Sequence, residues 1–246
     1  MPGTMSRLFG LTTATTVRWC AGVLLSACAS TFVPHVVHAA DCRAVAAPSI
    51  DWQDCNKSRL MLTSSTLDGA NLVSADLSYT DLRDSSFIGA NLEKVTLFRA
   101  SLDGSKADKA NFSRIEGYRT VFSGVSAREA SFASAELERA DFTNADLTGA
   151  DFSKAELGRA IFKGAVITGA KFAMANLSRT DLNAAKFEGP LDFSGAFLFR
   201  TRLEGMDLGQ ATGLQQWQVD QTCGDGNTKL PQGLTVPAKW TCSADE

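Results

Sequence analysis

A five-residue period runs through the middle of the chain and excludes most familiar folds. From Ala140 onward the sequence reads ADFTN, ADLTG, ADFSK and AELGR, with a leucine or phenylalanine at the centre of each unit and a small residue two positions earlier. An α-helix turns about 100° per residue, so this period would scatter the apolar side chains around its surface. An ordinary strand needs a period of two. The period therefore predicts a chain that turns a corner every five residues.

Four such units would close a coil of 20 residues around a narrow apolar core. One series of phenylalanines with this spacing is Phe112, Phe132, Phe152 and Phe172, and a second is Phe122, Phe142 and Phe162. Two units separate the series, which predicts two columns of rings on opposite sides of a four-sided coil. Coils stacked about 4.8 Å apart would pair their backbones. The expected fold is all-β, a parallel β-helix.

These units resemble the pentapeptide-repeat family, whose consensus is A-(D/N)-L-x-x. The resemblance covers residues 58–209 and implies a right-handed quadrilateral parallel β-helix, that is, a pentapeptide-repeat solenoid. One residue is inserted near Gly189-Pro190. Short residues occupy the central position at Ala107, Gly117 and Ala127, where we expect a local bulge or bend.

Residues 1–39 are expected to be a signal peptide. Two arginines and no acid accompany a short apolar run, and a small-residue site predicts cleavage after Ala39 or Ala40. The run is shorter than the roughly 20 residues of a membrane span. The segment LSAC resembles a lipobox, so lipidation at Cys28 is an alternative. We expect a periplasmic or secreted protein or, in the alternative, an outer-membrane lipoprotein.

Four further cysteines flank the repeats, and none lies among them. An even number of cysteines in an exported chain favours disulfides, and the local pairing is Cys42–Cys55 and Cys223–Cys242. A zinc site made from all four is the alternative, although no C-x-x-C spacing supports it. We expect residues 40–57 and 210–246 to form disulfide-bridged caps over the unpaired edges of the stack.

Residues that carry chemistry are scarce after the signal peptide. Both histidines, His35 and His38, fall within it or its cleavage region, so we expect no histidine triad and no histidine metal ligand. No phosphate-binding loop or dinucleotide fingerprint is present. Pairs of carboxylates occur only on positions expected to be convex and solvated, which leaves a hydrolase as a weak alternative. We expect no enzyme, no metal and no cofactor.

Two kinds of residue recur at the coil spacing on positions expected to form corners. Glycines at 69, 89, 149, 169 and 189 suit a corner that needs a positive φ. The second series consists of Arg99, Arg119, Arg139, Arg159, Arg179 and Arg200, all on one side. Either neighbouring acids such as Glu136 and Asp141 neutralise this stripe, or the stripe binds an anionic partner through its planar guanidinium groups.

The sequence thus predicts a non-catalytic exported scaffold or interaction protein with flat β-helix faces. The expected partner is an unknown protein or an anionic envelope polymer. Family resemblance offers another possibility, a DNA mimic that occupies DNA gyrase. The signal peptide, the net charge of only −3 and the arginine stripe count against it. We expect no nucleic-acid partner and membrane contact only with a lipidated Cys28, while the sequence leaves the oligomeric state open.

Overall fold

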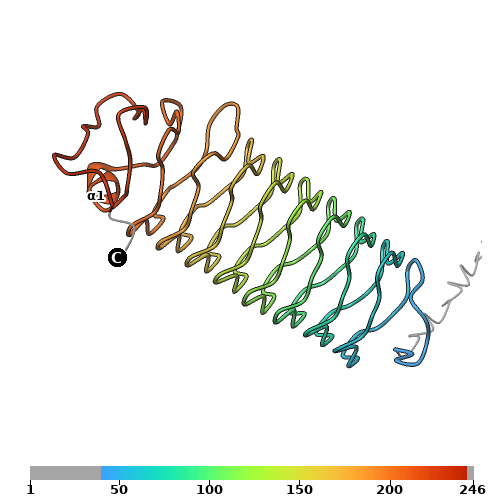
Figure 1. Ribbon diagram of the computed structural model, residues 1–246. Coiled ribbons are helices and arrows are strands. Elements are labelled where there is room, and N and C mark those ends of the chain that lie inside the picture. Colours follow the sequence, from blue (N-terminus) through green and yellow to red (C-terminus); the bar gives the residue numbers. More distant parts are fainter. Residues whose placement is uncertain (1–39, 243–246) are drawn as a thin grey trace, which may run out of the picture. The chain divides into compact units, whose positions relative to one another are not determined.

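The computed structural model describes residues 40–242. The expected signal peptide, with Ala39 and Cys28, lies outside the described residues. The described part of the chain forms a stack of similar coils, followed by an irregular segment at its C-terminal end (Figure 1). Within this part, no helix is long and apolar enough to cross a membrane.

Parallel backbone pairing between residues 20 apart holds the coils together. Each five-residue unit contributes one bridging residue, as in Asp51↔Asn71, Asn71↔Asn91 and Asn91↔Asn111. The amide of Leu72 donates to the carbonyl of Asn91 at 2.8 Å, and the amide of Asn91 donates to the carbonyl of Ala70 at 2.9 Å. Strand pairing is therefore confined to single residues, and four bridges per 20-residue coil confirm the predicted period.

A tight turn separates each bridge from the next. At Phe142, for example, the amide of Ala145 donates to the Phe142 carbonyl at 3.1 Å, and the intervening Asn144 has a φ of 57°. Asp141, just before the central residue, accepts the amide hydrogen of Thr143 at 2.9 Å. Side-chain acceptance of this kind stabilises turns. It explains why Asp and Asn recur at this position.

The two predicted columns of phenylalanine rings form the middle of the core. Phe112 and Phe132 stack with centroids 4.9 Å apart, and Phe122 and Phe142 do the same in the other column. Across the core, Phe132 and Phe142 meet edge to face at 5.7 Å and 85°. Both arrangements are favourable for aromatic rings, and every ring named here is buried. Phe193 extends the first column by one coil.

The bulge expected at Ala107, Gly117 and Ala127 does not form. The bridges Lys106↔Ser126, Glu116↔Glu136 and Ser126↔Asp146 all keep the 20-residue spacing. At Gly117 the space is already filled, because the Leu137 side chain comes within 2.9 Å of the place a Cβ would occupy. The expectation was wrong because neighbouring coils supply the missing volume. The single insertion near Gly189 shifts the spacing to 21, as in Lys171↔Asp192.

A disulfide joins Cys42 and Cys55 at the N-terminal end of the coils. The ladder already begins at Asp51, so it reaches beyond the expected boundary at residue 58. Trp52 is buried, and the Lys57 ammonium lies 3.8 Å from its ring centroid while donating to the Ala44 carbonyl at 3.2 Å. Burial lowers the pKa of Lys57, and the nearby Asp41 carboxylate partly opposes that shift.

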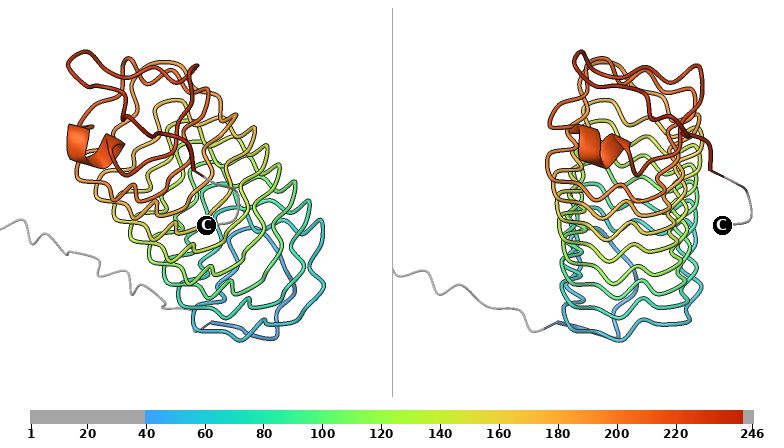
Figure 2. Two further views of the ribbon diagram at one scale, coloured as in Figure 1. Left: turned by 60° about the vertical axis from the view of Figure 1, so that its left-hand side comes forward. Right: turned by 90° about the vertical axis from the view of Figure 1, so that its left-hand side faces the viewer.

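The C-terminal segment adds an irregular last coil. It contains helix α1 (Gln216–Val219), a single turn beside the coils (Figure 2). Three of its residues continue the ladder, through Asp192↔Thr212, Arg202↔Cys223 and Asp207↔Lys229. Cys223 pairs with Cys242, and the Trp240 ring lies against Gly224, where a Cβ would meet it at 2.5 Å. Both disulfides therefore have the pairing that the sequence favoured.

Candidate binding face

One side of the coil carries arginine at nearly every corner, and we call it the arginine face. All six predicted arginines lie in one column, because the ladder stacks residues 20 apart and, across the insertion, 21 apart. Arg59 and Tyr79 begin the same column, and the corner residues have φ values from 53° to 60°. Sequence reasoning missed Arg59 because Tyr79 interrupts the series, although Arg59 precedes Arg99 by two coils.

Backbone geometry does not explain these arginines. The corner glycines have the expected positive φ, from 63° at Gly69 to 79° at Gly189. Lys109 and Glu129, which interrupt that series, adopt φ values of 60° and 56°. A residue with a Cβ pays roughly 1–2 kcal/mol for this conformation, so glycine would be the less strained choice at every corner. The arginine face has no glycine at its corners from residue 59 to 200.

The acids near the stripe do not form ion pairs with its arginines from Arg99 to Arg179. Within residues 40–242, no carboxylate oxygen lies within 4.0 Å of a guanidinium nitrogen in the set Arg99, Arg119, Arg139, Arg159 and Arg179. Glu156 instead accepts the side-chain amide of Asn176 at 2.7 Å. Acids that precede the central residue lie on the flat part of a side, whereas the arginines stand at its corner. Arg200, at the end of the column, has an interaction of its own.

Arginines on the other sides behave differently. Their guanidinium groups form ion pairs, at 2.6 Å in Arg83–Asp81, 3.1 Å in Arg114–Glu93 and 2.6 Å in Arg128–Asp146. The pairing with Asp81 raises the pKa of Arg83 and lowers that of the carboxyl group. The ion pairs considered for the stripe are thus found on other parts of the coils, whereas the side chains from Arg99 to Arg179 are exposed.

Aromatic side chains accompany the arginines at the N-terminal half of the face. The rings of Tyr79, Phe98 and Tyr118 follow one another at centroid distances of 5.4 and 5.5 Å. The guanidinium of Arg99 lies 5.5 Å from the Phe98 centroid, and that of Arg119 lies 5.3 Å from the Tyr118 centroid. These contacts are within the range of cation–π attraction. They hold two of the arginines against the face while leaving them exposed to solvent.

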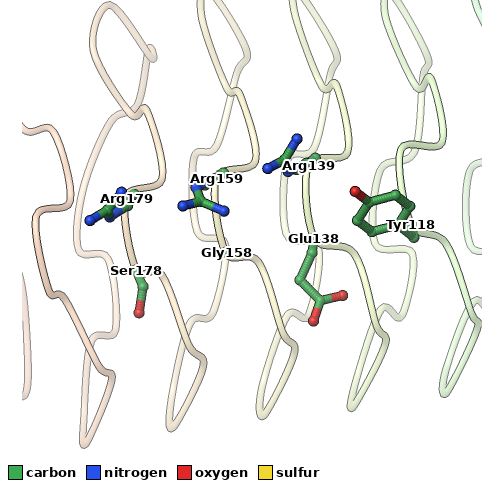
Figure 3. Close-up of a pocket in the computed structure, with 7 residues that line it drawn as sticks. All are labelled: Tyr118, Glu138, Arg139, Gly158, Arg159, Ser178 and Arg179. Carbon is green, nitrogen blue, oxygen red and sulfur yellow. The ribbon is translucent and has the colours of Figure 1, made fainter. Parts of the chain in front are cut away.

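A groove of about 440 Å³ lies beside the middle of the stripe. We call it the Gly158 groove; it is lined by Tyr118, Glu138, Arg139, Gly158, Arg159, Ser178 and Arg179. The position after the central residue carries a side chain in the coils on both sides, Glu138 and Ser178, but none at Gly158. Figure 3 shows the three guanidinium groups in a row, the Tyr118 ring beyond one end, and the Glu138 side chain directed away from the row. Sequence reasoning expected flat sides and missed this groove; its signal was a lone glycine beside the stripe.

The side chains of this face offer hydrogen-bond donors and acceptors. Among the residues that the structure describes, no three histidine, cysteine, aspartate or glutamate side chains gather to hold a metal ion. The groove offers guanidinium donors along one wall, the Glu138 carboxylate and Ser178 hydroxyl along the other, and an aromatic surface at one end. This arrangement is suited to recognising a ligand that is both anionic and hydroxylated.

Comparison with known families matches eight copies of a profile described as pentapeptide repeats, over residues 62–93, 75–114, 128–164 and 160–189. The chain belongs to the pentapeptide-repeat family. A comparison with curated proteins gave no match. Among solved structures, this pentapeptide-repeat chain is similar to HetL from the cyanobacterium Nostoc, a protein involved in heterocyst differentiation regulation. The identity is 25%, the TM-score is 0.42, and the match covers 78% of this chain and 91% of HetL.

Two further pentapeptide-repeat structures show lower identity. Full-length QnrB1, a plasmid-mediated fluoroquinolone resistance protein, is 19% identical with a TM-score of 0.39 over 70% of this chain and 94% of its own. Rfr23 from the cyanobacterium Cyanothece is 20% identical with a TM-score of 0.29 over 59% of this chain and 89% of its own.

Proposed function

We propose that this pentapeptide-repeat protein is a non-catalytic, exported scaffold whose arginine face holds an extended anionic partner. The observation that carries the proposal is the column from Arg99 to Arg179, which no described carboxylate neutralises. With it we propose the finer architecture, a right-handed quadrilateral coil. Four bridges per coil and two perpendicular sets of phenylalanine rings support four sides.

The charge balance of the arginine face supports an anionic partner. Its corners carry seven arginines, from Arg59 to Arg200, against five carboxylates on its outward positions, namely Asp76, Glu116, Glu136, Glu138 and Glu156. Guanidinium groups about one coil spacing apart, roughly 4.8 Å, repel one another. A bound polyanion would relieve this repulsion at each coil, so affinity would build up along the column.

The non-catalytic part of the proposal rests on where the carboxylates lie. Glu116, Glu136 and Glu156 are exposed on the outside of successive coils. General acid–base pairs depend on environments that differ between the two groups, whereas repeated coils give these three glutamates similar surroundings. Export is supported by the two disulfides, since such bonds persist in oxidising compartments.

The test is retention of the full chain on an anionic polymer at increasing salt. Replacing Arg119, Arg139 and Arg159 with Gln should lower the eluting salt concentration, because each change removes one exposed charge from the face. The matched control replaces Arg83, Arg114 and Arg128, which removes the same charge from other sides. Equal loss in both triple variants would show a general charge effect and contradict a dedicated face.

Cell fractionation of the host tests the second part of the proposal. The expected result is a processed chain in the periplasm or medium, with both disulfides intact in non-reducing peptide maps. A full-length chain with free thiols in the cytoplasm would contradict export.

A further inference from the structure

We infer that the Gly158 groove binds an acidic polysaccharide, with sugar carboxylates on Arg139, Arg159 and Arg179. The inference rests on the proposed function, an anionic partner on the arginine face, and names the chemical class of that partner. The direction of the groove, its mixture of acceptors and donors, and its charge support this class.

The groove runs along the stacking direction of the coils. Its lining residues recur from one coil to the next, from Tyr118 to Arg179, rather than around a single coil. A ligand in it therefore meets one arginine per coil, at intervals of roughly 4.8 Å. A linear polymer with one carboxylate per monomer, such as a polyuronate, can bring carboxylates to several arginines of the row, because the groove follows the same direction as the row and each arginine offers a planar guanidinium fork.

An acidic polypeptide uses less of what the groove offers. Its carboxylates could meet the arginines, but it brings no row of hydroxyl donors for Glu138 and Ser178 and no flat C–H surface for the Tyr118 ring.

The wall opposite the arginines favours hydroxyl groups on the ligand. Glu138 and Ser178 line the groove, and the Glu138 side chain points away from the guanidinium row in Figure 3. A carboxylate accepts hydrogen bonds and repels phosphate. Nucleic acids and polyphosphates would meet this acid with further anionic groups, whereas a sugar ring brings hydroxyl donors to it.

The Tyr118 ring provides an aromatic surface at one end of the groove. It stacks on Phe98 at 5.5 Å with nearly parallel planes, and the Arg119 guanidinium lies near its face. This packing holds the ring in place. A pyranose ring presents a flat array of C–H groups, and an ordered aromatic face is a surface on which such a ring can pack.

The absence of a side chain at residue 158 provides the space. A Cβ at Gly158 would have only ordinary contacts, 3.7 Å from the Glu138 side chain and 3.8 Å from the Ser178 carbonyl, and its φ is not in the left-handed region. The equivalent position carries Phe98 and Tyr118 in other coils of the same face. A larger residue can therefore be placed at 158 without disturbing the coil, which allows the groove to be filled selectively.

The experiment measures binding of the full chain to oligogalacturonates, with a chelator present to exclude calcium bridging. Gly158→Leu should weaken binding about tenfold, the effect of losing one good polar contact, while Gly158→Ala should stay close to the wild-type affinity. Replacing Arg139, Arg159 and Arg179 with Gln should weaken binding by about a hundredfold or more. Methyl-esterified oligomers should not bind, and circular dichroism should be unchanged in all variants.

Comparison polymers separate this inference from the proposed function. Polyglutamate and single-stranded DNA of equal charge should bind at least about tenfold more weakly than the uronate. If polyglutamate binds equally well and depends on the same arginines, the arginine face remains an anion-binding face but the polysaccharide assignment is wrong. If no polyanion binds, or if binding survives the triple arginine change, both the inference and the proposed function are overturned.

Discussion

The arginine corners and the glycine corners have the same backbone conformation but different side chains. Gly169 has a φ of 67° and Arg159 a φ of 60°, and the two corners are two repeat units apart along the chain. Glycine is common at corners but is not required there, since Ser64, Ser74 and Ala184 also adopt a positive φ. At the arginine corners the chain keeps a long charged side chain despite the strain of a left-handed backbone. The fold determines the backbone conformation of a corner, whereas the side chain at that corner can be selected for its contacts at the surface.

This contrast indicates that strain is accepted for the sake of the surface. Residues in sparsely populated conformations persist when the surrounding structure holds them there, and they are frequent at functional sites. Here the ladder gives every corner the same backbone conformation, so the residue type at a corner depends on backbone strain and on the role of the side chain at the surface. Seven arginines in one column therefore point to a binding role for their side chains.

The largest expected loss of stability tests whether the arginine corners and the glycine corners surround one packed core. Phe142→Ala removes a ring that stacks on Phe122 and meets Phe132 edge to face. Such truncations cost about 3–5 kcal/mol, so denaturant unfolding should move to much lower concentration. Tm and denaturant curves on the purified chain would check it, and a loss below about 1 kcal/mol would argue against the packed core.

A smaller change in the free energy of unfolding, with opposite signs for substitutions in the glycine and arginine columns, tests the comparison directly. Gly169→Arg should destabilise the protein by about 1 kcal/mol, because a Cβ there is 4.0 Å from its neighbour and only the positive φ opposes it. Arg159→Gly should leave stability unchanged or raise it by up to about 1 kcal/mol, since it relieves the same strain at some entropic cost. Equilibrium unfolding in urea measures both variants. A marked loss in Arg159→Gly would mean that the arginine stabilises the coil.

A third prediction contrasts the corners with the C-terminal segment, where an acid has a structural role. Asp225 accepts the Thr228 hydroxyl at 2.8 Å and the Gly205 amide at 3.0 Å, and these hydrogen bonds lower the pKa of its carboxyl group. A depressed folded-state pKa contributes stability above the unfolded value of about 3.9, and this contribution is lost as the pH falls through the folded pKa. Protease sensitivity of the tail should rise in that acidic range.

Asp225→Asn is the matched variant for this prediction. It should weaken the tail at neutral pH and flatten its response to acid, because the titrating group has been removed. An acid response identical to that of the wild-type chain would show that another group is responsible.

Much of the fold could be predicted because each repeat carries the same information. The spacing of Phe112, Phe132 and Phe152 is enough to set the coil length, and the stacked rings confirm it. The failure at Gly117 is different in kind. Whether a missing side chain leaves a gap depends on how Leu137 in the next coil packs, and this is a property of three-dimensional contacts rather than of the repeat.

The candidate site could be predicted only in outline. The 20-residue spacing is enough to predict that the arginines lie in one column. It does not predict which side chains their guanidinium groups contact. Glu156 lies three residues before Arg159 in the sequence, which suggested a neutralising pair, yet its carboxylate accepts the amide of Asn176 in the next coil. The Gly158 groove likewise depends on the side chains of adjacent coils, so no single repeat could reveal it.

The central claim is that the arginines from Arg99 to Arg179 carry like charges that no carboxylate of the described residues pairs with. The most direct measurement is the free energy of unfolding, without ligand, of wild-type protein and of the variant in which Arg119, Arg139 and Arg159 are Gln, at low and high salt. The account predicts that the variant is at least as stable as the wild type at low salt and that added salt stabilises the wild type more, because screening relieves repulsion. A variant that is less stable at low salt, with a deficit that salt removes, would show attraction to neighbouring acids and contradict the account.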